Sequence, residues 1–359
     1  MNEEWTVLAQ RIVQGLDVQP GELIQVRDDT ARPDLLLELL LAIELAGATP
    51  LPELASPDYL ERLWRAAPLD YLTQWDRHRQ AWLQQIDRVV VLGGAHPDIH
   101  AAPQEAFHAW ETAVQRLTDI EEARRLPFLV VGVPTERRAQ QMGVTLAELE
   151  ALLLPALLVP AADLQARIDR VLQAAEGAQH LVMRTGAGHE LHMQHGDRSW
   201  LSDDGRIDAA DRARGAIVSN LPAGSIYTTV LETQTEGSIW LPRAGQAEDV
   251  VLEFRNGRIT HIHAANGADS LTALFDRHSG EPRRVSHIGI GLNPHLAQPI
   301  GWTLVDEHVD GYLFLALGEN RYMGGQNESS LNVDFAVPQA TLVADGRILA
   351  PEGRVSGDR

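Results

Sequence analysis

A dense group of polar residues near the C-terminus is the first place where this chain could carry chemistry. Residues 324–335 read GGQNESSLNVDF and lie between two apolar runs that are typical of strands. Asp334 stands between Val333 and Phe335, in the first half of the predicted strand. A carboxylate buried in a strand needs a metal ion, a cation or a group of hydrogen-bond donors as its partner. The pattern therefore points to a functional site around Asp334.

Two histidine-rich segments could supply metal ligands. His261 and His263 in ITHIH are two residues apart, so a strand would place both on one face, either as a ligand pair or simply facing solvent. His189, His192 and His195 recur at three-residue spacing in GHELHMQH, and their role stays open.

The composition excludes several classes of mechanism. The chain has 359 residues with no cysteine and no lysine, so all 30 basic side chains are arginine. Disulfides, thiolate metal sites and cysteine nucleophiles are therefore excluded, and Schiff-base, pyridoxal-phosphate and P-loop mechanisms lose their key lysine. The formal net charge of −20, with no basic run, argues against nucleic acid or an anionic membrane as a partner.

The apolar segments give no sign of a membrane protein. The N-terminal stretch MNEEWTVLAQ is acidic and amphipathic, unlike a signal peptide. The longest apolar run, LLLELLLAIELAG, contains Glu38 and Glu44, which are too costly for a membrane span. We expect a cytoplasmic protein.

The order of strand and helix patterns predicts an α/β protein of two domains. Over residues 1–177, apolar runs such as 87–94 and 126–134 alternate with helical stretches at 57–86, 103–118 and 145–175, which is typical of a parallel α/β sheet. Over residues 178–359, short β-rich runs and turn signals, including the Asn-Gly of FRNGRITHI and the Asp-Gly of VADGRIL, predict a mostly antiparallel domain. The polar segment that contains Asp334 falls in this second domain.

Four stretches of the second half resemble motifs of the aminopeptidase T / aminopeptidase S family of metallopeptidases. They are NLPAGSIY (220–227), HIGIGLNP (287–294), DEHVDGYLFLALG (306–318) and the GGQNESSLNVDF segment, in the family's order and spacing. The resemblance implies the family's fold, descent from a hydrolase and a homodimer.

The resemblance also implies which residues should hold metal. In the family, two Glu, two His and one Asp bind two metal ions; Ser225 and His287 stand here at the two Glu positions. Phe314 and Asn332 stand at the His positions, and Asp334 alone is retained. Phenylalanine cannot bind a metal ion, and serine and asparagine are weak ligands for zinc-like metals. We therefore expect either no metal or one divalent ion (Fe, Zn or Mn), bound through His287 and Asp334.

Three functions stay open. The first is an altered enzyme that acts on a small molecule or short peptide. Its site would be metal-free, with Ser225, His287 and Asp334 as the residue types of a nucleophile, a base and an orienter, or mononuclear, as in the dihydroxypyridine ring-cleaving dioxygenase that SHIG (286–289) resembles. The second is a working metallo-aminopeptidase with unorthodox ligands from the histidine-rich segments. The third is a non-catalytic binding relative.

Other residues near these motifs are candidates for the same site. Glu307 stands at the family position that we associate with the general base. Tyr312 and Tyr322 could stabilise an oxyanion or pack on a ring, and His192 lies on the hairpin that borders the family's substrate pocket. The expected catalytic residues are His287, Ser225, Asp334 and Glu307, and the expected substrate-binding residues are Asn332, Phe314, Tyr312, His192 and Tyr322.

Overall fold

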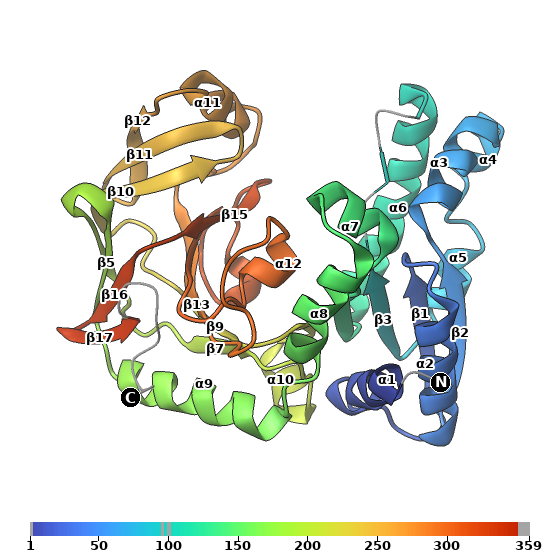
Figure 1. Ribbon diagram of the computed structural model, residues 1–359. Coiled ribbons are helices and arrows are strands. Elements are labelled where there is room, and N and C mark those ends of the chain that lie inside the picture. Colours follow the sequence, from blue (N-terminus) through green and yellow to red (C-terminus); the bar gives the residue numbers. More distant parts are fainter. Residues whose placement is uncertain (1–2, 95–96, 99–101, 351–359) are drawn as a thin grey trace. The chain divides into compact units, whose positions relative to one another are not determined.

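The computed structural model describes residues 3–94, 97–98 and 102–350 (Figure 1). The chain divides into two compact units: the first is Met1–Leu158 with Gly205–Pro222, and the second is Val159–Asp204 with Ala223–Arg359. This division differs from the single boundary after residue 177 that the sequence suggested. Helix α9 (Ala161–Ala175) belongs with the second unit, where it packs against β9 and β17, and a later segment returns to the first unit.

A five-stranded parallel sheet forms the centre of the first unit in the described part of the chain. Its order is β2-β1-β3-β4-β8. The strands are β1 (Leu23–Asp28), β2 (Thr49–Leu54), β3 (Arg88–Gly93), β4 (Phe128–Gly132) and β8 (Val218–Leu221). Most residues of β3 and β4 are buried, as expected for strands that are covered on both faces.

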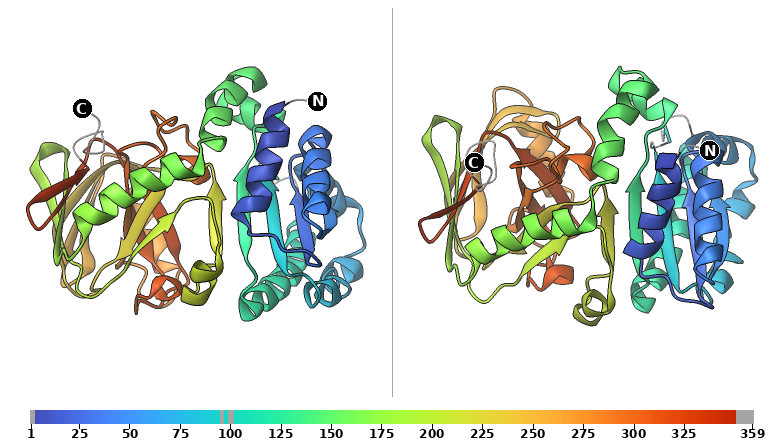
Figure 2. Two further views of the ribbon diagram at one scale, coloured as in Figure 1. Left: turned by 90° about the horizontal axis from the view of Figure 1, so that it is seen from below. Right: turned by 60° about the horizontal axis from the view of Figure 1, so that its bottom comes forward.

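Helices cover both faces of this sheet. They are α1 (Glu3–Gly15), α2 (Pro33–Leu45), α3 (Pro57–Ala66), α4 (Leu69–Thr73), α5 (Arg79–Leu83), α6 (Gln104–Arg124), α7 (Glu136–Met142), α8 (Leu146–Leu157) and α10 (Ala209–Arg214). The chain runs outward from β1 to β2 and then back past β1 to β3. Because such crossovers are right-handed, α2 and the α3–α6 group lie on opposite faces (Figure 2).

Two helical stretches that the sequence suggested are interrupted by prolines. The region 57–86 forms three short helices, with Pro68 as the N-cap of α4, and 145–175 forms α8 and α9, with Pro160 as the N-cap of α9. The residue before a proline is pushed out of the α conformation, so a helix usually ends there.

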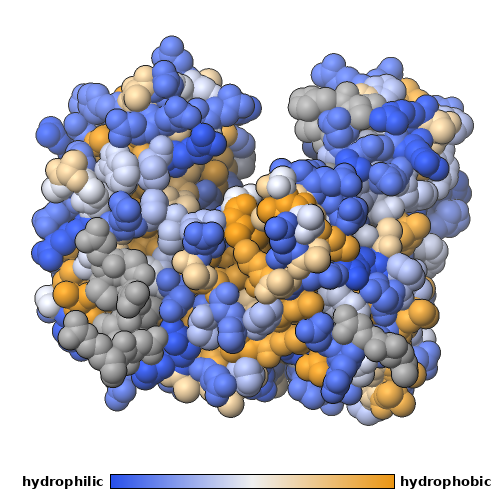
Figure 3. Space-filling view, viewed as in Figure 1, coloured by the Kyte–Doolittle hydropathy of each residue, from blue (hydrophilic) through white to orange (hydrophobic). Residues whose placement is uncertain are grey.

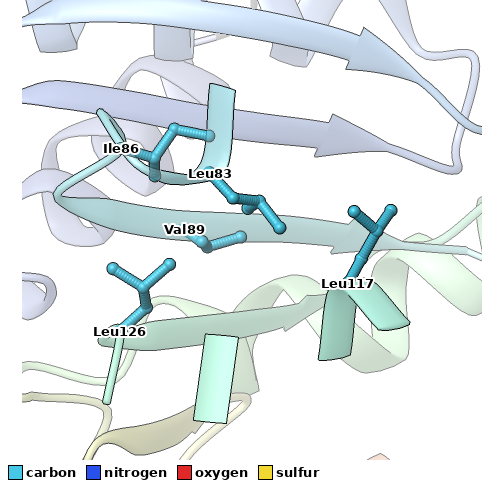
Figure 4. Close-up of a cluster of buried hydrophobic side chains, with 5 residues drawn as sticks. All are labelled: Leu83, Ile86, Val89, Leu117 and Leu126. Atoms are coloured by element: carbon cyan, nitrogen blue, oxygen red, sulfur yellow. The ribbon is translucent and has the colours of Figure 1, made fainter. Parts of the chain in front are cut away.

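An apolar cluster holds α5 and α6 against the sheet. Leu83 of α5, Leu117 of α6 and Val89 of β3 are buried together with Ile86 and Leu126 (Figure 4). These side chains fix the layer of helices above the sheet.

The second unit contains two antiparallel sheets among the described residues. The seven-stranded sheet has the order β12-β11-β10-β6-β5-β16-β17, and the five-stranded sheet has the order β15-β14-β13-β9-β7. The strands are β5 (His180–Thr185), β6 (His189–Gln194), β7 (Trp200–Asp203), β9 (Ser225–Thr229), β10 (Thr235–Ala244), β11 (Ala247–Arg255), β12 (Arg258–His263), β13 (Val285–Gly291), β14 (Leu313–Gly318), β15 (Asn332–Val337), β16 (Thr341–Ala344) and β17 (Arg347–Ala350). Short helices α11 (Ala268–Asp276) and α12 (Thr303–Asp306) connect them.

The predicted architecture, a parallel α/β part followed by an antiparallel β-rich part, is confirmed. The hairpins expected at Asn256-Gly257 and Asp345-Gly346 join β11 to β12 and β16 to β17. Strand β8 is the exception, because it lies in the antiparallel half of the sequence but pairs in parallel with β4. A four-residue strand has too little pattern of its own to reveal its partner.

The surface is largely hydrophilic on the face drawn in Figure 3, and hydrophobic residues gather around α8. Among the residues that the structure describes, no helix is long and apolar enough to cross a membrane.

Candidate functional site

The residues implied by the resemblance share one face of the five-stranded sheet. Residues paired across neighbouring strands point to the same side, and side chains alternate along each strand. His287 on β13 pairs with Thr229, while Ser225, four residues from Thr229 along β9, pairs with Gly291. Phe314 on β14 pairs with Gly289 of β13. On β15, Asp334 and Asn332 pair with Ala316 and Gly318, which extend the same face.

His287 and Asp334 are brought together in this arrangement. Nε2 of the buried His287 lies 3.2 Å from Oδ1 of Asp334. Nδ1 of His287 lies 3.0 Å from Oγ of Ser286, and this hydroxyl donates its proton to the carbonyl oxygen of Glu319 at 2.6 Å. Ser286 Oγ must therefore accept a hydrogen bond from His287 Nδ1–H, which leaves the lone pair of a neutral His287 on Nε2.

The contact between His287 and Asp334 is consequently one between two acceptors. Oδ1 of Asp334 is buried and accepts no hydrogen bond from the residues that the structure describes. Two acceptor atoms 3.2 Å apart repel each other unless a proton or a cation lies between them. The pair can therefore hold a proton, or supply two donor atoms to one metal ion.

Phe314 occupies the middle of the sheet face. A Cβ atom at Gly289 would lie 2.0 Å from Cζ of Phe314, so the phenyl ring rests directly on the glycine backbone. The ring centroid lies 5.8 Å from that of His287, edge to face, and Tyr227 makes a similar contact with His287 at 5.9 Å. An apolar ring thus stands between the rows of Ser225 and His287.

Ser225 is not brought to His287. It is buried at the start of β9 and faces Gly291, four residues along β13 from His287. At the rise of a strand this is a separation of about 13 Å along the sheet. The structure therefore does not form the triad of Ser225, His287 and Asp334 that their residue types allowed.

A cavity of about 390 Å³ opens beside Phe314 and Asp334 in the second unit. Glu307, at the C-terminal end of α12, also lines it, and burial together with the charges of Asp334, Asp203 and Asp306 raises the pKa of Glu307 to about 8. Glu307 is therefore mostly protonated at neutral pH and can donate a proton.

Tyr312 is a second donor on the wall of this cavity. Burial, followed by the charge of Asp306, raises the pKa of Tyr312 to about 12, so its hydroxyl keeps its proton. The cavity thus combines one apolar wall, at Phe314, with the proton donors Glu307 and Tyr312.

Three expected substrate-binding residues occupy different positions. Asn332 is exposed at the start of β15, and its Nδ2 donates a hydrogen bond of 3.0 Å to the hydroxyl of Tyr322, which is itself exposed. Phe314 and Tyr312 line the cavity, whereas neither Asn332 nor Tyr322 does. His192 lies in the seven-stranded sheet, 3.3 Å from Glu190 and stacked on His180.

The remaining histidines are engaged with other groups. His261 and His263 do share a strand face, as expected, but both are exposed and lie 3.3 and 3.4 Å from one carboxylate, Glu253. His189 contacts Ser238, and the buried His195 contacts Thr228. In the described part of the chain, no group of three or more His, Cys, Asp or Glu side chains could hold a metal ion.

A second buried His–Asp pair was not singled out from the sequence. His308 is completely buried, with its Nε2 3.8 Å from Oδ2 of Asp203, the residue that pairs with Ser225. Burial lowers the pKa of His308 against the opposing charge of Asp203, which favours the neutral imidazole. His308 follows Glu307 directly in the DEH triplet, and this position is the sequence feature that could have identified it.

Comparisons with known proteins identify the family and agree with the fold. The model of the family described as thermophilic metalloprotease (M29) matches residues 2–348. The chain is similar to the solved structure of wild-type AmpT from Thermus thermophilus, with a TM-score of 0.75 and 18% identity over 99% of both chains. It is also similar to 2,5-dihydroxypyridine dioxygenase from Pseudomonas putida KT2440, with a TM-score of 0.61 and 18% identity over 100% of this chain and 99% of the other. No curated protein sequence matched. At these identities the two structures establish the fold alone.

Proposed function

The chain belongs to the thermophilic metalloprotease (M29) family, and we propose that it is an enzyme whose dinuclear metal site has been dismantled. In this proposal it acts on a small molecule or a short peptide. The observation that carries the proposal is the ring of Phe314, which lies on Gly289 in the middle of the sheet face that the family motifs form.

The side chains at the motif positions do not fit a dinuclear centre. Such a centre needs several carboxylate or imidazole ligands to hold two dications about 3.5–4 Å apart. Ser225 and His287 are separated along the sheet, Phe314 has no donor atom, and Asn332 is engaged with Tyr322. Only His287 and Asp334 are strong ligands in contact with each other.

In the metal-free form of the proposal, His287 and Asp334 act as one proton-carrying unit. Nε2 of His287 accepts a proton from a water molecule or from the substrate, and the carboxylate of Asp334 stabilises the resulting charge. Glu307, protonated at neutral pH, donates a proton from the cavity wall. His287 as a base and Glu307 as an acid would together provide general acid–base catalysis.

A second candidate is a mononuclear metal site on the same two residues. It is favoured by the lone pair of His287 Nε2 and the unpaired Oδ1 of Asp334, which face one another across 3.2 Å. A divalent ion such as Fe, Zn or Mn would act there as a Lewis acid. The fold is shared with 2,5-dihydroxypyridine dioxygenase, and an aromatic substrate would suit the apolar wall at Phe314.

Metal content tests the proposal. The purified chain, incubated with zinc, manganese or ferrous ion and then dialysed, should retain at most one ion per chain. The double variant Phe314→His/Asn332→His restores the ligand types that the resemblance implies and should retain more metal than the parent. Two tightly bound ions in the parent chain would contradict the proposal.

Activity gives the matching functional test. Turnover of a leucyl anilide should stay below about 1 s⁻¹, the low end of ordinary enzyme rates, because two Lewis acids are missing. When a substrate is found in a screen of short peptides and aromatic amides, His287→Ala should abolish its turnover while leaving the melting temperature nearly unchanged. Rapid leucyl-anilide turnover that is lost on chelation would instead identify a working metallo-aminopeptidase.

A further inference from the structure

A separate cavity in the first unit lies between the sheet and helices α5 and α6, and it reaches the carboxyl ends of β1 and β2. The strand order β2-β1-β3 reverses at β1, and ligands in such folds bind beyond the carboxyl ends of the strands at the point of reversal. A cavity of about 290 Å³ is lined there by Asp29, directly after β1, and by Ala55, directly after β2. Its other wall comes from α5 and α6, which the cluster in Figure 4 holds above the sheet.

The sheet face below this cavity is polar, although a face covered by helices is ordinarily apolar. Arg27 of β1 pairs with Glu121 of α6. Arg79 of α5 pairs with Glu53 of β2 at 2.9 Å, and Gln25 also donates to Glu53 at 2.8 Å. Both guanidinium groups are therefore neutralised by glutamates within the fold.

Asp29 is the carboxylate that remains. It is half-buried beside Arg27, whose charge lowers the pKa of Asp29 but which already pairs with Glu121. Burial, followed by the charge of Asp28, raises the pKa of Asp29 to about 7. The cavity is therefore short of one positive charge when Asp29 ionises.

Aromatic rings line the same cavity. Trp75 and Trp110 meet edge to face with their ring centroids 5.8 Å apart, and the guanidinium of Arg79 lies 3.6 Å from the ring of Trp75. The indole N–H groups of both tryptophans are buried and have no hydrogen-bond partner in the described part of the chain. The rings give the cavity an aromatic wall against which a planar or apolar body can pack.

We propose that this cavity is a ligand site for a small organic cation, such as an amidine, a guanidine or a primary amine on an apolar or aromatic body. The cationic group pairs with Asp29, and the body packs against Trp75 and Trp110. An anion is disfavoured because Glu53 and Glu121 already neutralise both arginines.

Titration calorimetry with benzamidine tests this site on the full chain. Benzamidine should bind, and its affinity should fall between about pH 8 and about pH 6 as Asp29 becomes protonated. The other charged groups around Asp29 are Asp28, Arg27 and Glu53. The pH dependence should disappear in Asp29→Asn, which assigns the change to Asp29 rather than to these neighbours. Benzyl alcohol, a neutral probe of similar shape, should bind much more weakly.

Variants separate this site from the one on the sheet of the second unit. Asp29→Asn should weaken benzamidine binding by about tenfold or more, because a buried charge pair is lost. Glu44→Gln, which neutralises an exposed carboxylate of α2, should leave the affinity unchanged. Trp110→Leu should weaken binding independently of the charge. His287→Ala should have no effect, because it alters the proposed catalytic pair only.

Three results would overturn the proposal. They are the absence of benzamidine binding, equal affinity in Asp29→Asn and the parent chain, and loss of binding in His287→Ala, which would place the cation at the His287–Asp334 pair. Circular dichroism and the melting temperature of each variant establish that it is folded. The proposed catalytic function is tested separately, by metal content and by the turnover of His287→Ala. A negative result for benzamidine therefore leaves that proposal unaffected.

Discussion

Hydrogen bonding around single residues decides the chemistry of the sheet site. Ser286 fixes the proton of His287 on Nδ1 because its own proton goes to Glu319. The opposite ring nitrogen then faces Oδ1 of Asp334, which accepts no hydrogen bond from the described residues. Bringing two buried acceptors together costs free energy, which is not expected if His287 only fills space in the core.

Glu307 gives a prediction at the same scale. Its pKa is about 8 in the folded chain, raised from 4.5 mainly by burial. Folding therefore favours the neutral acid. Glu307 lowers the free energy of unfolding as the pH rises from about 4 towards 8, and it has no such effect below about pH 4. Glu307→Gln removes the ionisable group. At pH 9 its free energy of unfolding should exceed that of the parent chain by roughly a few kcal/mol.

Denaturant titrations of the parent chain and of Glu307→Gln check this directly. The difference between the two should be largest near pH 9 and close to zero near pH 4, where both side chains are neutral. An equal difference at both pH values would mean that Glu307 contributes through packing rather than through its charge.

At the centre of the site, β14 packs against β13 through the contact between Phe314 and Gly289. Because the ring of Phe314 rests on Gly289, a methyl group at residue 289 must displace it. Gly289→Ala should lower the free energy of unfolding by about 1–3 kcal/mol, the usual cost of overpacking a core. Gly93→Ala in β3 is the matched control, because its Cβ would meet nothing closer than 3.6 Å.

A double-mutant cycle with Phe314→Ala measures the same contact. Gly289→Ala should cost much less when the ring is absent, so the two effects should be strongly non-additive. If their effects on unfolding simply add, the ring does not depend on Gly289, and the argument that it blocks a dinuclear centre weakens.

At the level of strands, the sequence predicted where strands and hairpins form, but not which distant strands pair with each other. The buried runs of β3 and β4 and the Asn-Gly and Asp-Gly hairpins follow from local rules. The parallel pairing of β8 with β4 depends on contacts more than eighty residues apart, which no local pattern encodes.

The same limit applies to the candidate site. Period-two spacing makes Asn332 and Asp334 share a face, but the distance from Ser225 to His287 depends on the register of β9 against β13. Asp29 was not singled out because its surroundings come from separate segments: Glu53 lies in β2, and the opposite wall of the cavity comes from α5 and α6.

For the molecule as a whole, charge is the dominant surface property. The chain carries 50 acidic and 30 basic side chains, and the basic ones are all arginine. Many arginines are held in ion pairs, including Arg88 with Glu22 and Arg167 with Asp310, yet twenty acidic charges remain in excess. Like charges confined to a compact chain repel each other and lower its stability.

Salt should therefore stabilise this protein at neutral pH. Raising the ionic strength from about 0.01 M to about 0.15 M shortens the Debye length from about 30 Å to about 8 Å, which screens the long-range repulsion more than the short ion pairs. The melting temperature should rise over this range at pH 7, and the rise should shrink near pH 5, close to the sequence pI of about 5.0. Scanning calorimetry at both pH values and both salt concentrations gives the comparison. A fall in melting temperature with salt at pH 7 would mean that the arginine ion pairs outweigh the excess negative charge.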